Sequence, residues 1–433
     1  MFKVFANAWK IEDLRKKILF TAFIILLFRL GSAIPVPFLD AEGLAGLFQR
    51  YSESNNIFSF FNIMAGGAME KATFFSLSIS PYINASIIMQ LLMVAIPAFE
   101  RIMKEDGERG KKIMDTWTRI LTVVLAFVLG FGYYTVLLNA DGFQIVDKNV
   151  GVFGGFVITF AFAAGAMVIM WLGELINEKG IGNGISMILF AGIIARLPAL
   201  VASARALIST SVVNWIVLIL IAVGTLALVA FVVFMTNGER RIPVQYAKKV
   251  VGRKMYGGQN THIPLKVNMT GVLPIIFAQS FVVLPATIAN FFPKLLDTWF
   301  GKVVNALNVG GWVYTLLMFL LIVFFSYFYS VISFNPIEVA SNLKKNGGFI
   351  MGIRPGKPTA DYITKTLNRI TLIGALFLGI LSAAPSFVAM FNQNLASLAI
   401  GGTSLIIVVG VALETVKTLE SQMLMRHYKG FLE

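Results

Sequence analysis

Long apolar stretches recur along the whole chain, and they limit its possible folds more than any other feature. A helix needs about 20 apolar residues to cross the hydrocarbon core of a bilayer. Ten segments are candidates: residues 17–34, 72–96, 113–138, 152–172, 182–203, 212–236, 271–292, 310–333, 370–391 and 397–418. Because 57% of the 433 residues are hydrophobic and 13% are charged, a water-soluble globule would leave much apolar surface exposed. The sequence therefore predicts an all-α polytopic membrane protein with ten transmembrane helices.

The distribution of basic residues indicates how these helices are oriented. With both termini in the cytoplasm, 27 of the 36 Lys and Arg residues fall on the cytoplasmic side and 6 on the opposite side. Basic residues near span ends are retained in the cytoplasm. The other three, Arg29, Arg119 and Arg196, lie close enough to span ends to reach the headgroups. Topology thus explains most of the +14 net charge, although a basic face would also attract acidic partners or ribosomal RNA.

Few residues are suited to metal, redox or nucleotide chemistry. The chain has no cysteine, and its two histidines, His262 and His427, lie in different loops. The stretch GIRPGKP, which begins at Gly352, lacks the spacing of a phosphate-binding loop and the Ser or Thr after its Lys. We therefore expect no enzyme activity, no cofactor and no metal site. No small-residue cleavage site follows the first apolar segment, so we also expect no removable signal peptide.

Two short matches indicate an internal duplication. PYINA, which begins at Pro81, matches PIIFA at Pro274, and GISMIL at Gly184 matches GTSLII at Gly402. The paired segments are the second and the fifth of two five-span units. A unit with an odd number of spans is inserted upside down in its second copy. We therefore predict two inverted five-helix halves, residues 1–206 and 207–433.

Inverted halves suit either an ion-coupled solute transporter or a channel for a larger substrate, and intramembrane charge discriminates between them. A transporter keeps carboxylates near the midplane, where they are costly unless functional. Here no acidic residue lies in the middle third of a span. The matched segments instead carry aliphatic residues, namely Ile83, Ile87, Leu189, Ile276 and Ile407. A ring of these side chains would form a dry constriction that blocks ions, whereas ordinary helix packing is the alternative for any one of them.

Two cytoplasmic loops are much longer than the roughly 2 to 8 residues that antiparallel helices need. In residues 237–270, RRIPVQYAKK and THIPLKVN alternate apolar and polar positions around a Gly-rich turn, which predicts a basic β-hairpin. In residues 334–369, a short helical stretch leads into a basic turn rich in Gly and Pro. Loops of this length favour docking of a large soluble partner, and plain solvated loops are the alternative.

Several motifs, in order along the chain, resemble the SecY family, the central subunit of the general secretory protein-conducting channel, in its bacterial form. They are SPYINASIIMQLL, EKGIGNGIS, RRIPVQYAKK with THIPLKVNMTGVLP, NPIEVASNLKKNGGFIMGIRPG and GGTSLIIVVGVALE. The likeness runs nearly end to end. It implies a central hourglass pore between the two halves, with the five aliphatic residues as its waist. The family usually has Ile where this chain has Leu189, which affects only the tightness of the seal.

The resemblance also explains residues 58–71, FSFFNIMAGGAMEK, which are too apolar for an exposed loop and too short to cross a bilayer. It implies that residues 58–69 form a re-entrant plug helix, with an apolar body and a glycine hinge, buried inside the protein. The body would be Phe58, Phe60 and Phe61, and the hinge Gly66 and Gly67. An interfacial helix on the outer leaflet is the alternative.

The resemblance further implies a lateral gate between spans 2 and 3 and spans 7 and 8, through which a signal sequence or membrane segment reaches lipid. Candidate gate residues are the polar Asn84, Ser86, Gln90, Gln279 and Ser280. Implied partners are SecE, SecG, the motor ATPase SecA, the ribosome and the translocating polypeptide. Candidate docking residues for SecA or the ribosome are Arg240, Arg241, Arg253 and Arg354. The implied location is the bacterial plasma membrane, with both termini in the cytoplasm.

Overall fold

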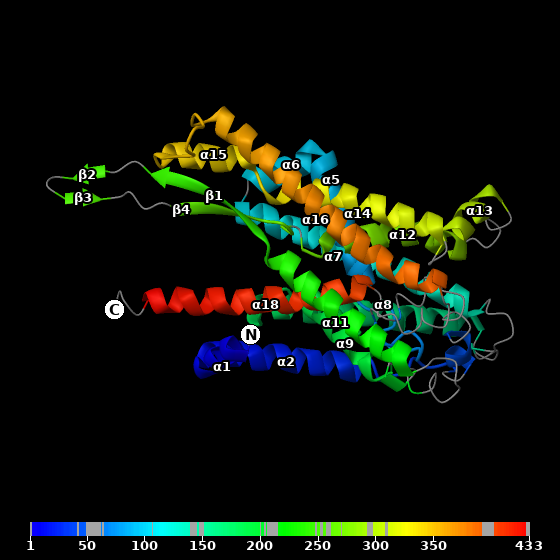
Figure 1. Cartoon of the computed structure of the whole chain (residues 1–433). Helices are drawn as coiled ribbons and strands as arrows, with labels where there is room; N and C mark the ends of the chain where they lie inside the picture. The colour runs from blue at the N-terminus through cyan, green and yellow to red at the C-terminus, as the bar shows by residue number, and fades with distance from the viewer. Residues whose placement is uncertain are drawn as a thin grey trace.

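The protein is a bundle of long helices with a small β-structure projecting from one end (Figure 1). The computed structural model describes residues 2–40, 43–48, 62, 65–105, 107–138, 145–146, 151–199, 201–202, 205, 215–246, 249–251, 254–256, 261–269, 271–291, 298–307, 311–391 and 402–429. Helix α1 (Phe2–Lys10) and the C-terminal end of α18 (Gly402–Lys429) lie toward the end of the bundle that carries the hairpin (Figure 1). This placement agrees with termini on one side, while their orientation in the membrane stays a prediction.

Each of the ten predicted segments contains a helix. These helices are α2 (Glu12–Gly31), α5 (Ser80–Ala95), α7 (Gly107–Leu138), α8 (Gly151–Lys179), α9 (Gly184–Ala195), α11 (Trp215–Asn237), α12 (Leu273–Phe291), α14 (Trp312–Ser333), α16 (Lys357–Phe391) and α18 (Gly402–Lys429). Within the described ranges, five helical segments are long and apolar enough to cross a membrane: Gly107–Leu138, Gly151–Lys179, Ile219–Asn237, Trp312–Lys345 and Lys357–Ala384. The helical membrane class is confirmed, and the count of ten crossings stays a prediction.

Shorter helices in the described part of the chain include α1 (Phe2–Lys10), α6 (Pro97–Glu105), α13 (Trp299–Ala306) and α15 (Pro336–Lys345). Helices α9 and α15 begin at asparagines that cap them. The Asn183 side chain accepts hydrogen bonds from the amides of Ile185 and Ser186, and Asn335 caps α15 in the same way. Gly184 follows directly, and a side chain there would overlap the Gly173 carbonyl oxygen. The GIGNG motif is therefore a tight turn that packs α9 closely against α8.

Helix α5 begins at Ser80, so the segment predicted for residues 72–96 starts too early. Residues 65–79 form turns instead, because Ala72 and Ser78 adopt left-handed backbone angles (φ 46° and 51°) that no helix accommodates. Pro81 then occupies the first turn of α5, where its missing amide is tolerated. The helix has 16 residues, so a non-helical segment takes up part of this predicted span.

The predicted hairpin is confirmed, and it forms one sheet with a strand from the second long loop, residues 334–369. Strand β1 (Glu239–Tyr246) pairs antiparallel with β4 (Thr261–Lys266), and β2 (Lys249–Val251) pairs with β3 (Lys254–Tyr256) farther out. The end of β1 also pairs with the short strand β5 (Gly348–Phe349), which the sequence did not predict. A shared apolar core joins the sheet to α15 and α16, and it consists of Ile242, Val244, Leu265, Leu343, Ile350, Ile363 and Ile370.

We expect Leu265→Ala to loosen this unit. Leu265 is fully buried, so truncation leaves a cavity and costs about 2–5 kcal/mol of stability. The measurement is the rate of limited proteolysis within residues 239–266 in membranes, which should rise. Lys266→Ala is the matched control, because its side chain is exposed on the same strand. Equal protease resistance of the Leu265 variant and the control would contradict the shared core.

Candidate pore constriction and plug seat

The five aliphatic residues predicted to form the constriction lie in one buried hydrophobic cluster. They are Ile83, Ile87, Leu189, Ile276 and Ile407, and each is at most 7% exposed. They come from α5, α9, α12 and α18, so both halves of the sequence contribute. Among the described residues, the buried polar side chains are Ser, Thr, Asn and Gln, with no Asp, Glu, Lys or Arg. The interior of the bundle therefore offers aliphatic surface and few groups that hold an ion.

The plug prediction falls partly outside the described residues. Phe58, Phe60 and Phe61 lie there, so their predicted role stays a prediction. Gly66 and Gly67 are described, and both adopt left-handed angles (φ 67° and 83°) that favour glycine. They form a turn rather than a helix, and the amide of Gly67 donates to the Asn62 carbonyl oxygen at 2.9 Å.

Three residues that the sequence did not link to the plug, Asn62, Glu70 and Arg196, hold this turn in place. Asn62 is 2% exposed, and its side chain donates to Glu70 Oε2 at 2.6 Å while its Oδ1 accepts from the Glu70 amide at 3.1 Å. Arg196, just after α9, pairs with the same Glu70 oxygen at 3.6 Å. The sequence contained one signal for this contact, the acidic residue Glu70 close to the apolar FSFF stretch. Sequence alone did not indicate its partners.

The three arginines predicted to reach the headgroups have protein partners. Arg119 Nε donates to Glu174 Oε1 at 2.8 Å, which joins α7 to α8. Arg29 of α2 donates to the Gly66 carbonyl oxygen at 3.5 Å. With the Arg196–Glu70 pair, these contacts give each of the three arginines a partner within the protein. Their predicted reach to the headgroups stays a prediction.

Ser86, Gln90 and Gln279 of the predicted gate form hydrogen bonds within their own half of the sequence. Gln90 donates to Ser86 at 3.1 Å inside α5, and buried Gln279 of α12 donates to the Tyr314 hydroxyl of α14 at 3.2 Å. Asn84 and Ser280 are half-buried. Helix α12 packs against α7, so the two halves meet on this side of the bundle. The proposed bonds across the gate stay a prediction.

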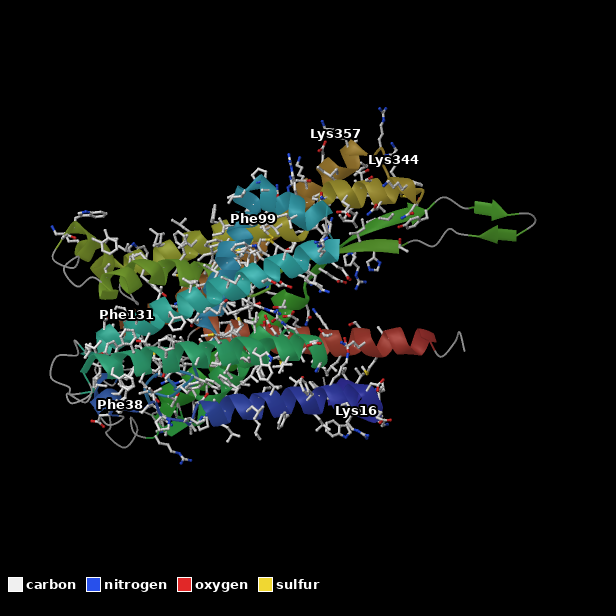
Figure 2. The ribbon with its side chains drawn as sticks, turned by 180° about the vertical axis from the view of Figure 1, so that it is seen from behind. Lys16, Phe38, Phe99, Phe131, Lys344 and Lys357 are labelled. Carbon is white, nitrogen blue, oxygen red and sulfur yellow. The ribbon has the colours of Figure 1, made fainter. Side chains whose placement is uncertain are left out.

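The predicted docking residues lie at the hairpin end, apart from the constriction. Arg240 and Arg241 are exposed on β1, and Arg354 is exposed in the turn before α16. Arg253 lies outside the described residues. Lys16, Lys344 and Lys357 also lie toward this end in Figure 2, whereas Phe38 and Phe131 lie toward the other. Basic side chains thus concentrate at one end of the bundle.

Arg241 is engaged within its own strand. Its Nε donates to Glu239 Oε1 at 2.7 Å and its Nη2 lies 2.6 Å from the same oxygen. This hydrogen bond is the main reason that the pKa of Glu239 is lowered. Arg240 and Arg354 are therefore better placed than Arg241 to meet an acidic partner. Within the described part of the chain, no group of three His, Cys, Asp or Glu side chains could hold a metal ion.

Comparison with known proteins decides the family. The SecY family model matches residues 73–416. The chain belongs to the SecY family. The protein translocase subunit SecY of Streptomyces galbus is 44% identical over 100% of both chains, and that of Mycobacterium tuberculosis is 40% identical over 100% of both.

Solved structures show the same fold. A protein-conducting channel has a TM-score of 0.67 at 19% identity, covering 94% of this SecY-family chain and 92% of that chain. Sec61 in the canine ribosome–channel complex has a TM-score of 0.62 at 18% identity, covering 94% and 92%. The membrane-channel fold predicted from the motifs is therefore confirmed.

We expect Arg241→Gln to raise the pKa of Glu239 toward its ordinary value. The pKa of Glu239 is lower in the folded protein than in the unfolded chain. The Arg241–Glu239 contact therefore stabilises the hairpin fully at pH values above the unfolded pKa of Glu239. This stabilisation is lost as the pH falls through the folded pKa. A carboxyl-carbon NMR titration of Glu239 in the two proteins measures the shift. Arg240→Gln is the control, and an equal pKa in all three proteins would contradict the contact.

Proposed function

We propose that this SecY-family chain forms a protein-conducting channel that passes unfolded secretory polypeptides across the bacterial plasma membrane and releases transmembrane segments sideways into lipid. One observation carries the proposal: five aliphatic residues from four helices converge in one buried apolar cluster. The named relatives, which are translocase subunits, support it. The chain itself would be a channel and not an enzyme.

The constriction suits a polypeptide of varied sequence. A moving chain presents charged, polar and apolar side chains in turn, so a channel lined by fixed binding groups would retain some of them. Branched aliphatic side chains offer no hydrogen bonds, deform around the chain and close again. When they close, they leave no continuous water path for ions or protons. Residues 58–69 would add a plug on the outer side.

Two inverted halves, residues 1–206 and 207–433, would enclose this constriction. Pro81 and Pro274 are each the second residue of their helices, α5 and α12, and Gly184 and Gly402 are each the first residue of α9 and α18. Packing is equivalent as well, because α5 contacts α7 and α7 contacts α8, as α12 contacts α14 and α14 contacts α16. These correspondences support a duplicated unit whose copies meet at the pore.

The lateral gate would open where α5 and α7 face α12 and α14. A segment exposed there partitions between pore and lipid. About 20 apolar residues at roughly 0.3–0.6 kcal/mol each favour the bilayer, and one central charge opposes insertion by about 2.5–3.5 kcal/mol. Sorting would therefore need no chemistry in the channel. Asn84, Ser86, Gln90, Gln279 and Ser280 would tune the closed state through weak hydrogen bonds.

Energy and assembly would come from partners. SecA or the translating ribosome would dock on the cytoplasmic sheet and the turn at Arg354, SecE would clamp the halves, and SecG would lie beside the first half. The basic hairpin end supports a cytoplasmic position of this face and of both termini. The canine Sec61 channel of the same fold was solved in a ribosome–channel complex, which supports ribosome docking.

An ion-coupled solute carrier is the second candidate, because inverted repeats also build such carriers. It is less well supported, since the buried set of described residues contains no carboxylate to bind a coupling ion. Proton-dependent uptake into vesicles that contain this subunit alone would favour it. A structural scaffold, the third candidate, predicts no conductance even after deletion of residues 58–69.

The constriction is tested by replacing Ile83, Ile87, Ile276 and Ile407 together with Ser. Polar side chains hydrate the waist, so we expect ion conductance of the resting translocase in planar bilayers to rise at least several-fold. The matched control is Ile88→Ser with Ile194→Ser, because both side chains are 37% exposed on α5 and α9, outside the buried cluster. Unchanged conductance of the four-residue variant, with normal insertion, would count against the channel.

Partner docking is tested by Arg354→Glu. Reversal of an exposed charge at the docking face should slow SecA-driven translocation about tenfold, because like charges replace an attraction, while membrane insertion of the variant stays normal. The measurement is precursor uptake by inverted vesicles. Lys357→Glu is the matched control, exposed three residues away at the start of α16, and should have a smaller effect. Normal uptake with Arg354→Glu would remove this residue from the docking site.

A further inference from the structure

The turn at the C-terminal end of the predicted plug is closed on itself by two hydrogen bonds between Asn62 and Glu70. Asn62 and Glu70 exchange both bonds, at 2.6 and 3.1 Å, across eight residues. The Gly67 amide adds a backbone bond to Asn62. Asn62 is buried and lies within the predicted plug, so these bonds join residue 62 to the turn at residues 65–70.

This turn is tied to the rest of the bundle by charged side chains from two other helices. Arg196 Nη2 lies 3.6 Å from Glu70 Oε2, the oxygen that also accepts from Asn62. Arg29 donates to the Gly66 carbonyl oxygen. A side chain at Gly66 would come within 3.2 Å of the Gly192 backbone of α9, so the turn rests closely on that helix.

We propose, resting on the proposed function, that Glu70 and Arg196 form an ionic latch that holds the plug turn on α9 in the idle channel. The carboxylate of Glu70 has two partners that differ in origin. Asn62 lies in the same turn as Glu70 and would move with it. Arg196 is the C-cap residue of α9, the helix that supplies Leu189 to the proposed constriction. Displacing the plug keeps the first contact and breaks the second.

The exposure of the pair suits a latch that opens and closes. The side chains of Arg196 and Glu70 are 24% and 34% exposed, so water screens their attraction and replaces it when they separate. A fully buried ion pair would leave a costly unpaired charge on opening. The pair therefore biases the closed state without preventing a polypeptide from displacing the plug.

Charge-neutral variants separate the latch from the fold of the turn. In Glu70→Gln, the side-chain oxygen and the backbone amide of residue 70 can still form both hydrogen bonds with Asn62, but the charge that attracts Arg196 is gone. Arg196→Gln removes the positive charge of the pair. In planar bilayers that contain the whole translocase, we expect resting ion conductance to rise roughly two- to fivefold in either variant. Lys71→Gln, a charge removal at the exposed neighbouring residue, is the matched control and should leave conductance unchanged.

The charge swap completes the experiment. Glu70→Arg and Arg196→Glu alone should each increase conductance, and their combination should restore it toward the wild-type value. If the Gln variants match Lys71→Gln, or the swap conducts as much as the single reversals, the latch is wrong. Precursor translocation and the four-Ser variant are measured on the same preparations. If the latch variants fail but precursor translocation is normal and the four-Ser variant conducts more, only the latch is wrong. If translocation and the four-Ser variant also give negative results, the proposed function is wrong as well.

Discussion

The bilayer core offers no water to backbone amides and carbonyls, and this constraint shapes every part of the structure. Helices satisfy it locally, which is why helices occupy all ten apolar segments. Residues 65–79 leave the helical conformation, so their polar groups need partners elsewhere in the protein. They find them in the segment after α2, where Val36 donates to the Ala72 carbonyl oxygen and Phe74 donates to that of Ile34. Non-helical backbone at the plug seat is therefore possible because it is enclosed by protein.

In the proposed channel, apolar and polar contacts would have different roles in closure. The buried aliphatic cluster is held by apolar contacts that have no preferred direction, so it would re-form after displacement. Polar contacts occur at Asn62, Glu70 and Arg196, and at Gln279, which donates to Tyr314, a member of the cluster, between α12 and α14. In the proposed channel, these directional bonds would specify one closed arrangement, and the partial exposure of Glu70 and Arg196 would keep it reversible.

The sheet links two loops that are about 100 residues apart in sequence. Because β5 pairs with β1 and the sheet shares an apolar core with α15 and α16, the predicted docking residues Arg240 and Arg354 belong to one packed unit. Helix α16 continues from this unit into the bundle, with Ile363 and Ile370 in the core of the sheet.

The sequence by itself determined the features that depend on local periodicity and composition. These include the helical segments, the alternating strands of the hairpin, the aliphatic identity of the constriction and the family motifs. Tertiary structure decided what depends on partners far along the chain: the start of α5 at Ser80, the pairing of β5, and the contacts of Arg29, Arg119 and Arg196. A charged residue near a span end has water, a headgroup or a carboxylate as possible partners. Only the packed bundle, by bringing Glu70 and Glu174 within reach, determines which one it meets.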